Sequence, residues 1–308
     1  MRSNKQITSP VMLSYDMSVS EEEWTAIQHL INSNADPVIS KKDTNLYNQA
    51  PRYTVIKINQ NNFFLIADGR GRDKKTNPHA FFGKGAFARV KGAVQFLKKK
   101  GGYQPDDKGY AVKIYNRGHL EDEDTFKDIL DEAKYFKQAY GSVGKVIRSN
   151  DKSKVYFIMP KLPGITLDQI DYASLSLNQL IQIIMATIFE LIRFQDMGIA
   201  HGDIKSDNIL FDQTSGRAYF IDFGVCSPFY RLSQFQLAEL INAFENPLKR
   251  YVDDNDLIPA IVDEIFSLVD PHTHKLALNN SSSETLANKL HTIITEMMNH
   301  ASRKTLEW

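Results

Sequence analysis

The sequence predicts an α+β protein built in two lobes, with strands in its first half and helices in its second. Up to about residue 164, apolar residues come in short runs between polar loops that carry glycine, which is typical of strands. Beyond that point they recur at helical spacing over longer segments. Because strands and helices do not alternate, this order favours a sheet-based lobe followed by a helical lobe.

Composition narrows the class of protein and of partner. The 308 residues are 42% hydrophobic and 24% charged, which is ordinary for a folded chain. Lys plus Arg and Asp plus Glu each number 37, and this zero net charge argues against nucleic acid as a partner. The single cysteine, Cys226, is typical of a reducing compartment. With neither a secretory signal nor a membrane span in the sequence, we expect a cytoplasmic protein.

A helical extension is expected in residues 1–50, ahead of the first lobe. Ser20–Glu23 has the spacing of a capping box, and Trp24 opens an apolar pattern at helical spacing. This helix should end near residues 34–37, and we expect it to pack on the first lobe.

The first lobe is expected over residues 51–162. Short apolar runs between polar turns predict its strands, and a helical period predicts its one helix. The predicted elements are strands at 53–58, 63–67, 110–115 and 155–159, two strands around a turn within 81–96, and a helix at 124–140. The polar segment 98–108 is expected to be a connection.

The second lobe is expected over residues 163–308 and should be mainly helical. Its longest predicted helix, 177–194, carries a broad apolar face. Two short strands are expected at 209–211 and 218–221.

Three groups of residues have the pattern of a phosphate-handling site, and the first is the glycine-bearing segment Gly83–Val90. Closely spaced glycines let backbone N–H groups approach phosphate oxygens without a Cβ in the way. Ala88 stands at the third glycine of a G-x-G-x-x-G pattern, and an ordinary hairpin would also explain glycines here. The predicted strands on both sides argue against a dinucleotide site, in which a helix follows the turn.

The second group centres on Lys113, inside the apolar strand Ala111–Ile114. A lysine in such a run is costly unless its amine reaches a partner or water. It either snorkels to solvent at a strand edge or directs its charge at phosphates. In the second case it needs a carboxylate, and Glu132 follows on the predicted helix, with Asp131 beside it as a competitor.

The third group consists of two polar segments set among apolar residues, His201–Leu210 and Ile221–Gly224. Phosphoryl transfer needs a carboxylate at the attacking hydroxyl, metal ligands at the phosphates and cations that balance charge. The residues for these roles are Asp203 for the proton, Asn208 and Asp222 as hard oxygen ligands for Mg²⁺, and Lys205 for the transferred group.

In this order the motifs resemble the signature of the protein kinases of the Ser/Thr type. The resemblance covers residues 80–225, and it implies a small, mainly antiparallel β lobe with one helix and a mainly α-helical lobe. It implies ATP as the phosphate donor, Mg²⁺ or Mn²⁺ as the metal, and a protein as the substrate. The catalytic residues would be Lys113, Glu132, Asp203 and Lys205, and the metal ligands Asn208 and Asp222.

The resemblance also implies which residues surround the nucleotide. Gly83, Lys84, Gly85, Ala86 and Phe87 would cover the phosphates, and Val90, Ala111 and Leu210 would enclose the adenine. Met159 would be the gatekeeper, and Leu162 would offer hinge backbone groups. Phe136, His201 and Phe223 would form the spine that aligns the two lobes.

The sequence departs from the family pattern at two places. Gly202 replaces the arginine that usually precedes the catalytic aspartate and grips an activation-loop phosphate, so we expect activity that does not depend on that phosphorylation. No Ala-Pro-Glu motif follows Gly224, after which only 84 residues remain. The second lobe should therefore be reduced. In this respect the chain resembles the compact kinases that bacterial pathogens deliver into the host cytosol, and a partner protein or ligand could complete it.

Two other functions stay open. A His-Gly-Asp loop is also usual in small-molecule phosphotransferases that resemble aminoglycoside and choline kinases, and Pro163–Leu167 would suit that group. A nucleotide-binding scaffold is the third candidate, because a missing substrate platform would leave ATP binding as a regulatory device. Lys205 favours the protein kinase, since it matches the lysine of the Ser/Thr type.

Overall fold

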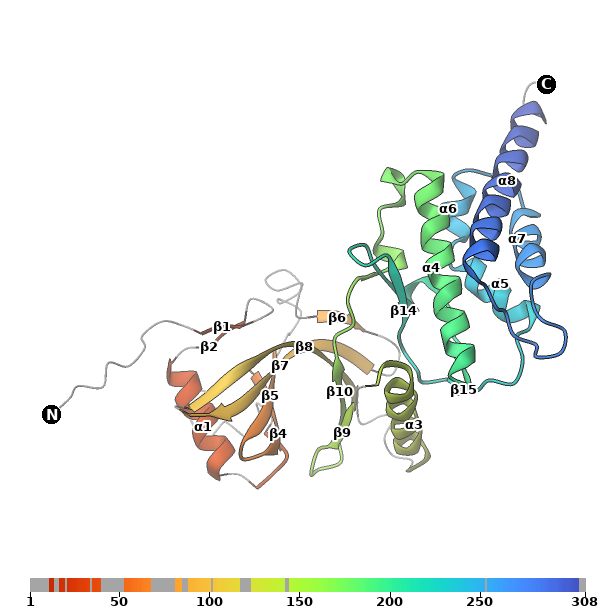
Figure 1. The fold of residues 1–308 in the computed structure, drawn as a ribbon. Coiled ribbons are helices and arrows are strands. Elements are labelled where there is room, and N and C mark those ends of the chain that lie inside the picture. Colours follow the sequence, from red (N-terminus) through yellow and green to blue (C-terminus); the bar gives the residue numbers. More distant parts are fainter. Residues whose placement is uncertain are drawn as a thin grey trace. The chain divides into compact units, whose positions relative to one another are not determined.

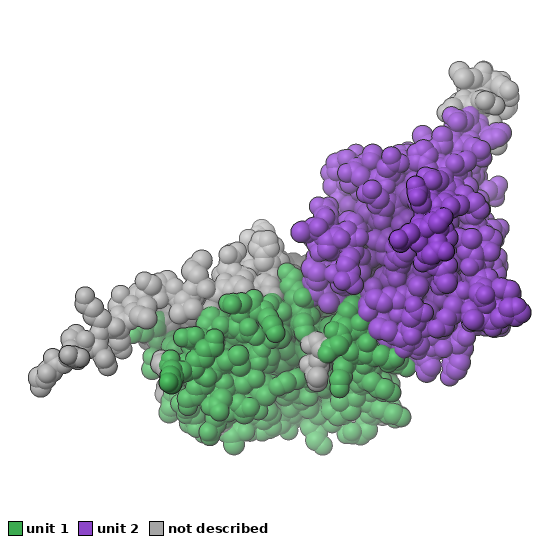
Figure 2. Space-filling model, viewed as in Figure 1, with its two compact units in different colours: residues 1–161 green, residues 162–308 purple. Residues whose placement is uncertain are grey.

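A computed structural model of the chain describes residues 11–13, 17–19, 21–33, 35–39, 53–67, 81–84, 88–100, 102–116, 123–141, 144–252 and 254–304. The chain divides into two compact units, residues 1–161 and residues 162–308 (Figure 2). In the described residues, unit 1 holds a curled antiparallel sheet with helices α1 and α3, and unit 2 is mainly helical (Figure 1). The predicted α+β class is confirmed.

The sheet of unit 1 is antiparallel throughout and follows the order β3-β4-β5-β7-β8-β10-β9, with β6 paired to β7. Its strands are β3 (Val38–Ile39), β4 (Tyr53–Asn59), β5 (Asn62–Ala67), β6 (Phe81–Lys84), β7 (Ala88–Lys99), β8 (Gly102–Asn116), β9 (Lys145–Arg148) and β10 (Lys154–Pro160). A separate hairpin joins β1 (Val11–Leu13) and β2 (Met17–Val19). The predicted hairpin over β4 and β5 is confirmed.

The expectation of a connection at 98–108 is wrong. Strands β7 and β8 run on through this segment as one long hairpin, and Lys99 pairs with Gly102 across its turn. The register shifts between Val94 and Phe96, where a bulge lets the pair bend. The segment reads as polar because Gln104 and several neighbours are exposed, while Tyr103 still packs on the core.

Helix α1 (Glu21–Ser33) packs on this long hairpin and on the strands beside it. Its buried residues Ile27, Leu30 and Ile31 form one apolar cluster with buried residues of the sheet, which are Val55, Phe63, Leu65, Val94 and Phe96. Trp24 lies 5.0 Å from the Phe96 ring, centroid to centroid. The helix is therefore part of the core of unit 1, as the sequence predicted. Ser20, its expected cap, lies outside the described residues.

Helix α3 (Glu123–Tyr140) packs against β9 and β10 and has the predicted helical face. Phe136 meets Phe157 of β10 edge to face, with ring centroids 5.9 Å apart. Near its first turn, Arg148 of β9 contacts Glu123 at 3.3 Å and lies over the Phe126 ring. Both contacts fix the helix against the sheet.

Unit 2 is organised around α4 (Leu177–Asp196). A capping box formed by Ser176 and Gln179 stands at the start of this helix. The other helices are α5 (Gln234–Asn242), α6 (Glu245–Lys249), α7 (Leu257–Phe266) and α8 (Asn280–Lys304). Short strands complete the unit: β11 (Ile165–Thr166), β13 (Ile209–Asp212) and β14 (Arg217–Phe220) in one sheet, and β12 (Ile199–Ala200) with β15 (Ser227–Pro228) in another.

Helix α4 is the one helix among the described residues that is long and apolar enough to cross a membrane by length and composition. The expectation that no segment of the sequence is long and apolar enough to span a membrane is therefore too strong for this helix. Since 56% of its most apolar stretch is buried inside the protein, the helix has the surroundings of a core element.

Candidate active site

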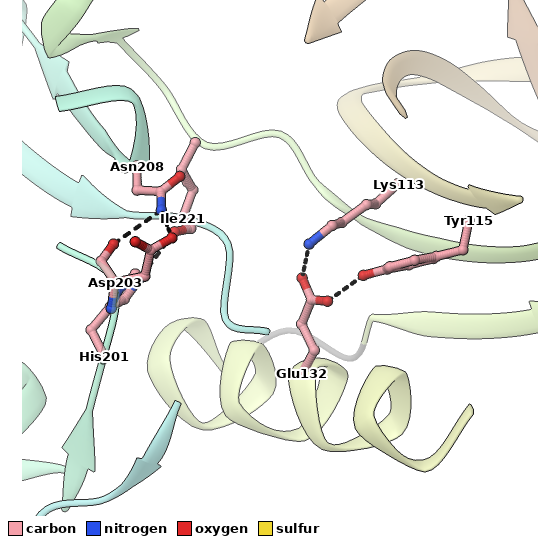
Figure 3. A network of polar contacts seen from close by, with 7 residues as sticks. All are labelled: Lys113, Tyr115, Glu132, His201, Asp203, Asn208 and Ile221. Carbon is pink, nitrogen blue, oxygen red and sulfur yellow. Dashed lines mark hydrogen bonds and ion pairs between the residues drawn. The ribbon is translucent and has the colours of Figure 1, made fainter. Parts of the chain in front are cut away.

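The part of the candidate site in unit 1 is a cluster of three polar side chains on β8 and α3 (Figure 3). Lys113 donates from Nζ to Oε1 of Glu132 at 2.8 Å. The hydroxyl of Tyr115 donates to the second oxygen of the same carboxylate, Oε2. The Lys113 amine also lies 5.3 Å from the centre of the Tyr115 ring. Each of the three side chains therefore contacts the other two.

Burial shows which carboxylate serves the lysine. The Glu132 side chain is 4% exposed and that of Lys113 is 12% exposed, whereas Asp131 faces solvent. The choice that the sequence left open between Asp131 and Glu132 therefore falls on Glu132. A carboxylate buried to this degree is tolerated only when charge and hydrogen bonds compensate for the lost water, and Lys113 and Tyr115 supply both.

The expected nucleotide contacts of unit 1 lie on neighbouring strands. Ala111 on β8 pairs with Met159 on β10, and Lys113 on β8 pairs with Val90 on β7. Gly83 and Lys84 end β6, opposite β7. Residues 85–87, which include the expected Gly85, Ala86 and Phe87, lie outside the described residues. Leu162 and Leu210 belong to unit 2, where Leu210 lies on β13.

The part in unit 2 is the loop between β12 and β13, which brings Asp203, Lys205 and Asn208 together. Asp203 receives a hydrogen bond from the Asn208 amide Nδ2 at 2.8 Å, and its backbone carbonyl receives another at 3.0 Å (Figure 3). Lys205 Nζ lies 2.9 Å from Oδ2 of Asp203. This hydrogen bond raises the pKa of the Lys205 amine above its ordinary value, so Lys205 stays charged beside the carboxylate.

Asp222 follows β14 and stands in a strained backbone conformation, with φ of 65°. Left-handed backbone is uncommon outside glycine and often marks a functional position. Its neighbour Ile221 is held on both sides: the Ile221 N–H donates to the Asn208 carbonyl at 2.9 Å, and the Ile221 carbonyl lies 2.9 Å from Nε2 of His201. These contacts fix the chain around Asp222 relative to the loop.

His201 is a buried structural residue of this loop. Burial lowers its pKa, although its bond to Ile221 and the nearby Asp222 and Asp203 oppose that effect. Its ring packs in an aromatic cluster with Phe194, Phe220 and Phe223, at centroid distances of 5.2 to 6.1 Å. His201 and Phe223 therefore meet as expected for spine residues. The third, Phe136, belongs to unit 1.

Gly202 has a geometric reason to be glycine. Its φ is 79°, and a Cβ placed there would come within 2.6 Å of the Val225 carbonyl oxygen. The usual arginine would clash with this backbone, which passes directly over the loop. The close approach of residues 202 and 225 therefore explains why a glycine stands where the family usually has an arginine.

The segment after Gly224 is short and tied down by backbone hydrogen bonds. Strand β15 pairs with β12, the Phe229 N–H donates to the Gly198 carbonyl at 2.9 Å, and Leu232 N–H donates to the His274 carbonyl at 2.9 Å. Helix α5 begins at Gln234, where Ser233 and Gln236 form a capping box. The segment has an ordered path without a phosphate to hold it.

The side chains present fit a divalent metal held together with phosphates. Because Nδ2 of Asn208 donates to Asp203, the amide oxygen is the atom left to ligate a metal. The described residues contain no group of three or more His, Cys, Asp or Glu side chains that could hold a metal alone. Asn208 and Asp222 would therefore share the ion with oxygens of the nucleotide, which is the usual manner of Mg²⁺ binding.

Sequence reasoning missed two residues of these clusters. Tyr115 reads as an apolar strand residue, and only the position of α3 shows that its hydroxyl meets Glu132. Glu239 on α5 reads as a solvated helix residue. Burial raises its pKa, and the charge of Asp203 adds to the effect, so a second carboxylate lies in the electrostatic surroundings of Asp203. Neither residue carries a local motif that could have revealed it.

These side chains are the ones that ATP-dependent phosphoryl transfer with a divalent metal requires. They are a lysine–glutamate pair, a loop carboxylate with its lysine, and two oxygens that can bind a metal. The family model described as "Protein kinase domain" matches residues 77–245, more than half of the chain. The chain belongs to the protein kinase family, and the membership that the sequence motifs predicted is confirmed.

Proposed function

We propose that the protein is a Ser/Thr protein kinase that transfers the γ-phosphoryl group of ATP to a hydroxyl of a protein substrate. The observation that carries the proposal is Lys205, which stands two residues after the loop carboxylate Asp203 and contacts it. A lysine at this position resembles the lysine of the Ser/Thr type. In this role Lys205 offsets negative charge that grows on the transferred group. A protein substrate follows from membership of the family.

Each polar residue has one task in this reaction. Asp203 orients the acceptor hydroxyl and takes its proton as the hydroxyl oxygen bonds to the γ-phosphorus, while the bond from that phosphorus to ADP breaks. Lys113, held by Glu132, fixes the phosphates in line. Asn208 and Asp222 would hold Mg²⁺, which neutralises charge on the phosphates when bound; Mn²⁺ offers the same oxygen-loving chemistry.

Activity should not require phosphorylation of the segment after Gly224. Two observations support this part of the proposal. Gly202 leaves no arginine to grip a phosphate, and residues 225–233 are already held by backbone hydrogen bonds to Gly198 and His274. Treatment with a phosphatase should therefore leave the rate unchanged.

The residues after Gly224 lack an Ala-Pro-Glu motif, which supports a partner protein or ligand that completes the platform for the substrate. Full turnover by the isolated chain would count against this partner. The single cysteine, Cys226, supports action in a reducing cytoplasm, that of a host cell included.

The deciding experiment is transfer from γ-labelled Mg·ATP by the wild type and by Asp203→Asn, each offered basic proteins, a cell lysate, aminoglycosides and choline. Label in protein that disappears in the variant is the expected result. Label only in small molecules would overturn the protein kinase in favour of the small-molecule phosphotransferase. Binding of Mg·ATP without transfer, even after lysate fractions are added, would favour the scaffold.

A further inference from the structure

Tyr115 lies where it can control the lysine–glutamate pair. It follows Lys113 by two residues on β8, so both side chains leave the same face of the strand. Both are in the middle of the sheet, since Lys113 pairs with Phe157 and Tyr115 with Val155 on β10. Tyr115 is buried, with 6% of its surface exposed. Its ring is fixed by the sheet, and its hydroxyl reaches α3 (Figure 3).

The chemistry of Glu132 requires more than one donor. An ionised carboxylate has two oxygens, and each loses its water when the side chain is buried. Lys113 occupies Oε1, and the Tyr115 hydroxyl occupies Oε2. With the lysine alone, one buried oxygen would have lost its water without gaining this donor. The hydroxyl therefore favours the position of α3 in which Glu132 lies against β8.

We propose that Tyr115 is a positioning residue, which holds Glu132 and through it keeps Lys113 directed at the ATP phosphates. The inference rests on the proposed kinase function, because it is that function which gives Lys113 its task. All three residues belong to unit 1, so the chain assembles this part of the site by contacts within one compact unit. The lysine–glutamate pair must be in place for transfer in protein kinases. Tyr115 helps to hold the pair in place from its position in the sheet.

A purely structural role for the Tyr115 ring predicts something different. The ring packs in the sheet and lies 5.3 Å from the Lys113 amine, and phenylalanine would keep both features. Only the hydroxyl separates the two roles. The test variant is therefore Tyr115→Phe, which removes one oxygen and leaves the packing.

The same strand offers a matched control in Tyr110. Its hydroxyl lies within hydrogen-bond distance of two acceptors, Gln95 Oε1 at 2.6 Å and Asp106 Oδ2 at 3.1 Å, and its ring meets Phe64 edge to face. Tyr110→Phe thus removes a hydrogen-bonded phenol from β8 without touching Glu132. Any general cost of losing a phenol from this strand should appear in both variants.

The experiment measures kcat, KM for ATP, Mg·ATP affinity and thermal stability for the wild type, both phenylalanine variants, Glu132→Ala and the double variant Tyr115→Phe/Glu132→Ala. A hydrogen bond to a charged group predicts a loss of about tenfold or more in kcat/KM for Tyr115→Phe. Tyr110→Phe should match the wild type. In the Glu132→Ala background, which has no acceptor for the hydroxyl, Tyr115→Phe should have no further effect on kcat/KM, because the residue acts through Glu132.

Each outcome has one meaning. Equal rates and equal Mg·ATP affinities for both phenylalanine variants and the wild type would overturn the inference, and so would additive losses in the double variant. A wild type that binds Mg·ATP but transfers nothing would instead contradict the proposed function, and the affinity data would still test Tyr115. A wild type that binds no Mg·ATP would overturn both.

Discussion

The two units each contain a lysine in contact with a carboxylate, and the two pairs differ sharply in their surroundings. Lys113 and Glu132 in unit 1 are 12% and 4% exposed, and Tyr115 occupies the second carboxylate oxygen. Lys205 and Asp203 in unit 2 are 50% and 40% exposed, at nearly the same distance, 2.9 Å against 2.8 Å. Distance alone therefore does not distinguish the pairs; burial does.

This difference in burial separates a pair that holds a side chain in place from a pair whose carboxylate can react. A buried pair is expensive to open, because either partner left alone would keep an uncompensated charge away from water. An exposed pair is worth little to stability, since water and salt screen it. Glu132 is thus placed to hold Lys113 still, whereas Asp203 can exchange its lysine contact for a substrate hydroxyl at small cost.

The largest effect is expected from Asp203→Asn. The amide cannot take the proton of the acceptor, so the transfer rate should fall by about a thousandfold, within the range of general-base effects. Mg·ATP affinity should be retained. The measurement is single-turnover transfer with Asp207→Asn as the control, because Asp207 is an exposed carboxylate of the same loop. A wild-type rate in Asp203→Asn would remove Asp203 from the mechanism.

Glu132→Ala should give the next largest effect, on stability as well as on rate. It leaves Lys113 buried without its carboxylate, which should cost unit 1 about 3 kcal/mol in its free energy of unfolding. Chemical denaturation with a probe in unit 1 measures this cost, and Asp131→Ala on the exposed side of α3 is the control. If the two alanine variants were equally stable, burial would not be what distinguishes the two pairs.

The pH dependence of stability should be set in unit 2 by His201. Its pKa in the folded state is lowered by burial from the ordinary value of 6.5, so the unfolded chain binds a proton more readily. Stability should therefore fall as the pH drops below about 6.5, by at most about 1.4 kcal/mol per pH unit. Thermal melts between pH 5 and 8 test this, the range in which histidine titrates.

His201→Gln should reduce that slope, because glutamine does not titrate and can still donate toward the Ile221 carbonyl. His300→Gln, a change on the exposed surface of α8, should leave the slope as it is. A slope that persists in His201→Gln would mean that another group senses the pH.

The smallest effect is expected from Lys205→Ala on stability. An exposed ion pair typically contributes less than about 1 kcal/mol, so the free energy of unfolding should hardly change while the transfer rate falls. Denaturation and transfer assays on the same preparation separate the two quantities. A loss of stability as large as that of Glu132→Ala would make the exposed pair a structural one and weaken the contrast between the units.

Much of the chemistry could be predicted from the sequence, because it depends on residue type at short spacing. The segment His201–Leu210 places a carboxylate, a lysine and an amide within one loop, and no distant part of the chain is needed to bring them near one another. Most elements were predictable for the same reason: α3 and α4 show their helical period, and β4 and β5 are short apolar runs on either side of a polar turn.

Tertiary structure decided what depends on residues far apart in the chain. Asp131 and Glu132 are neighbours of similar chemistry, and only the face on which α3 meets the sheet makes Glu132 the partner of Lys113. Tyr115 acquires its role from that same packing, and Gly202 is required because the backbone of Val225 passes over it. Local pattern fixes which groups a chain can offer, whereas burial and approach across the fold decide which of them meet.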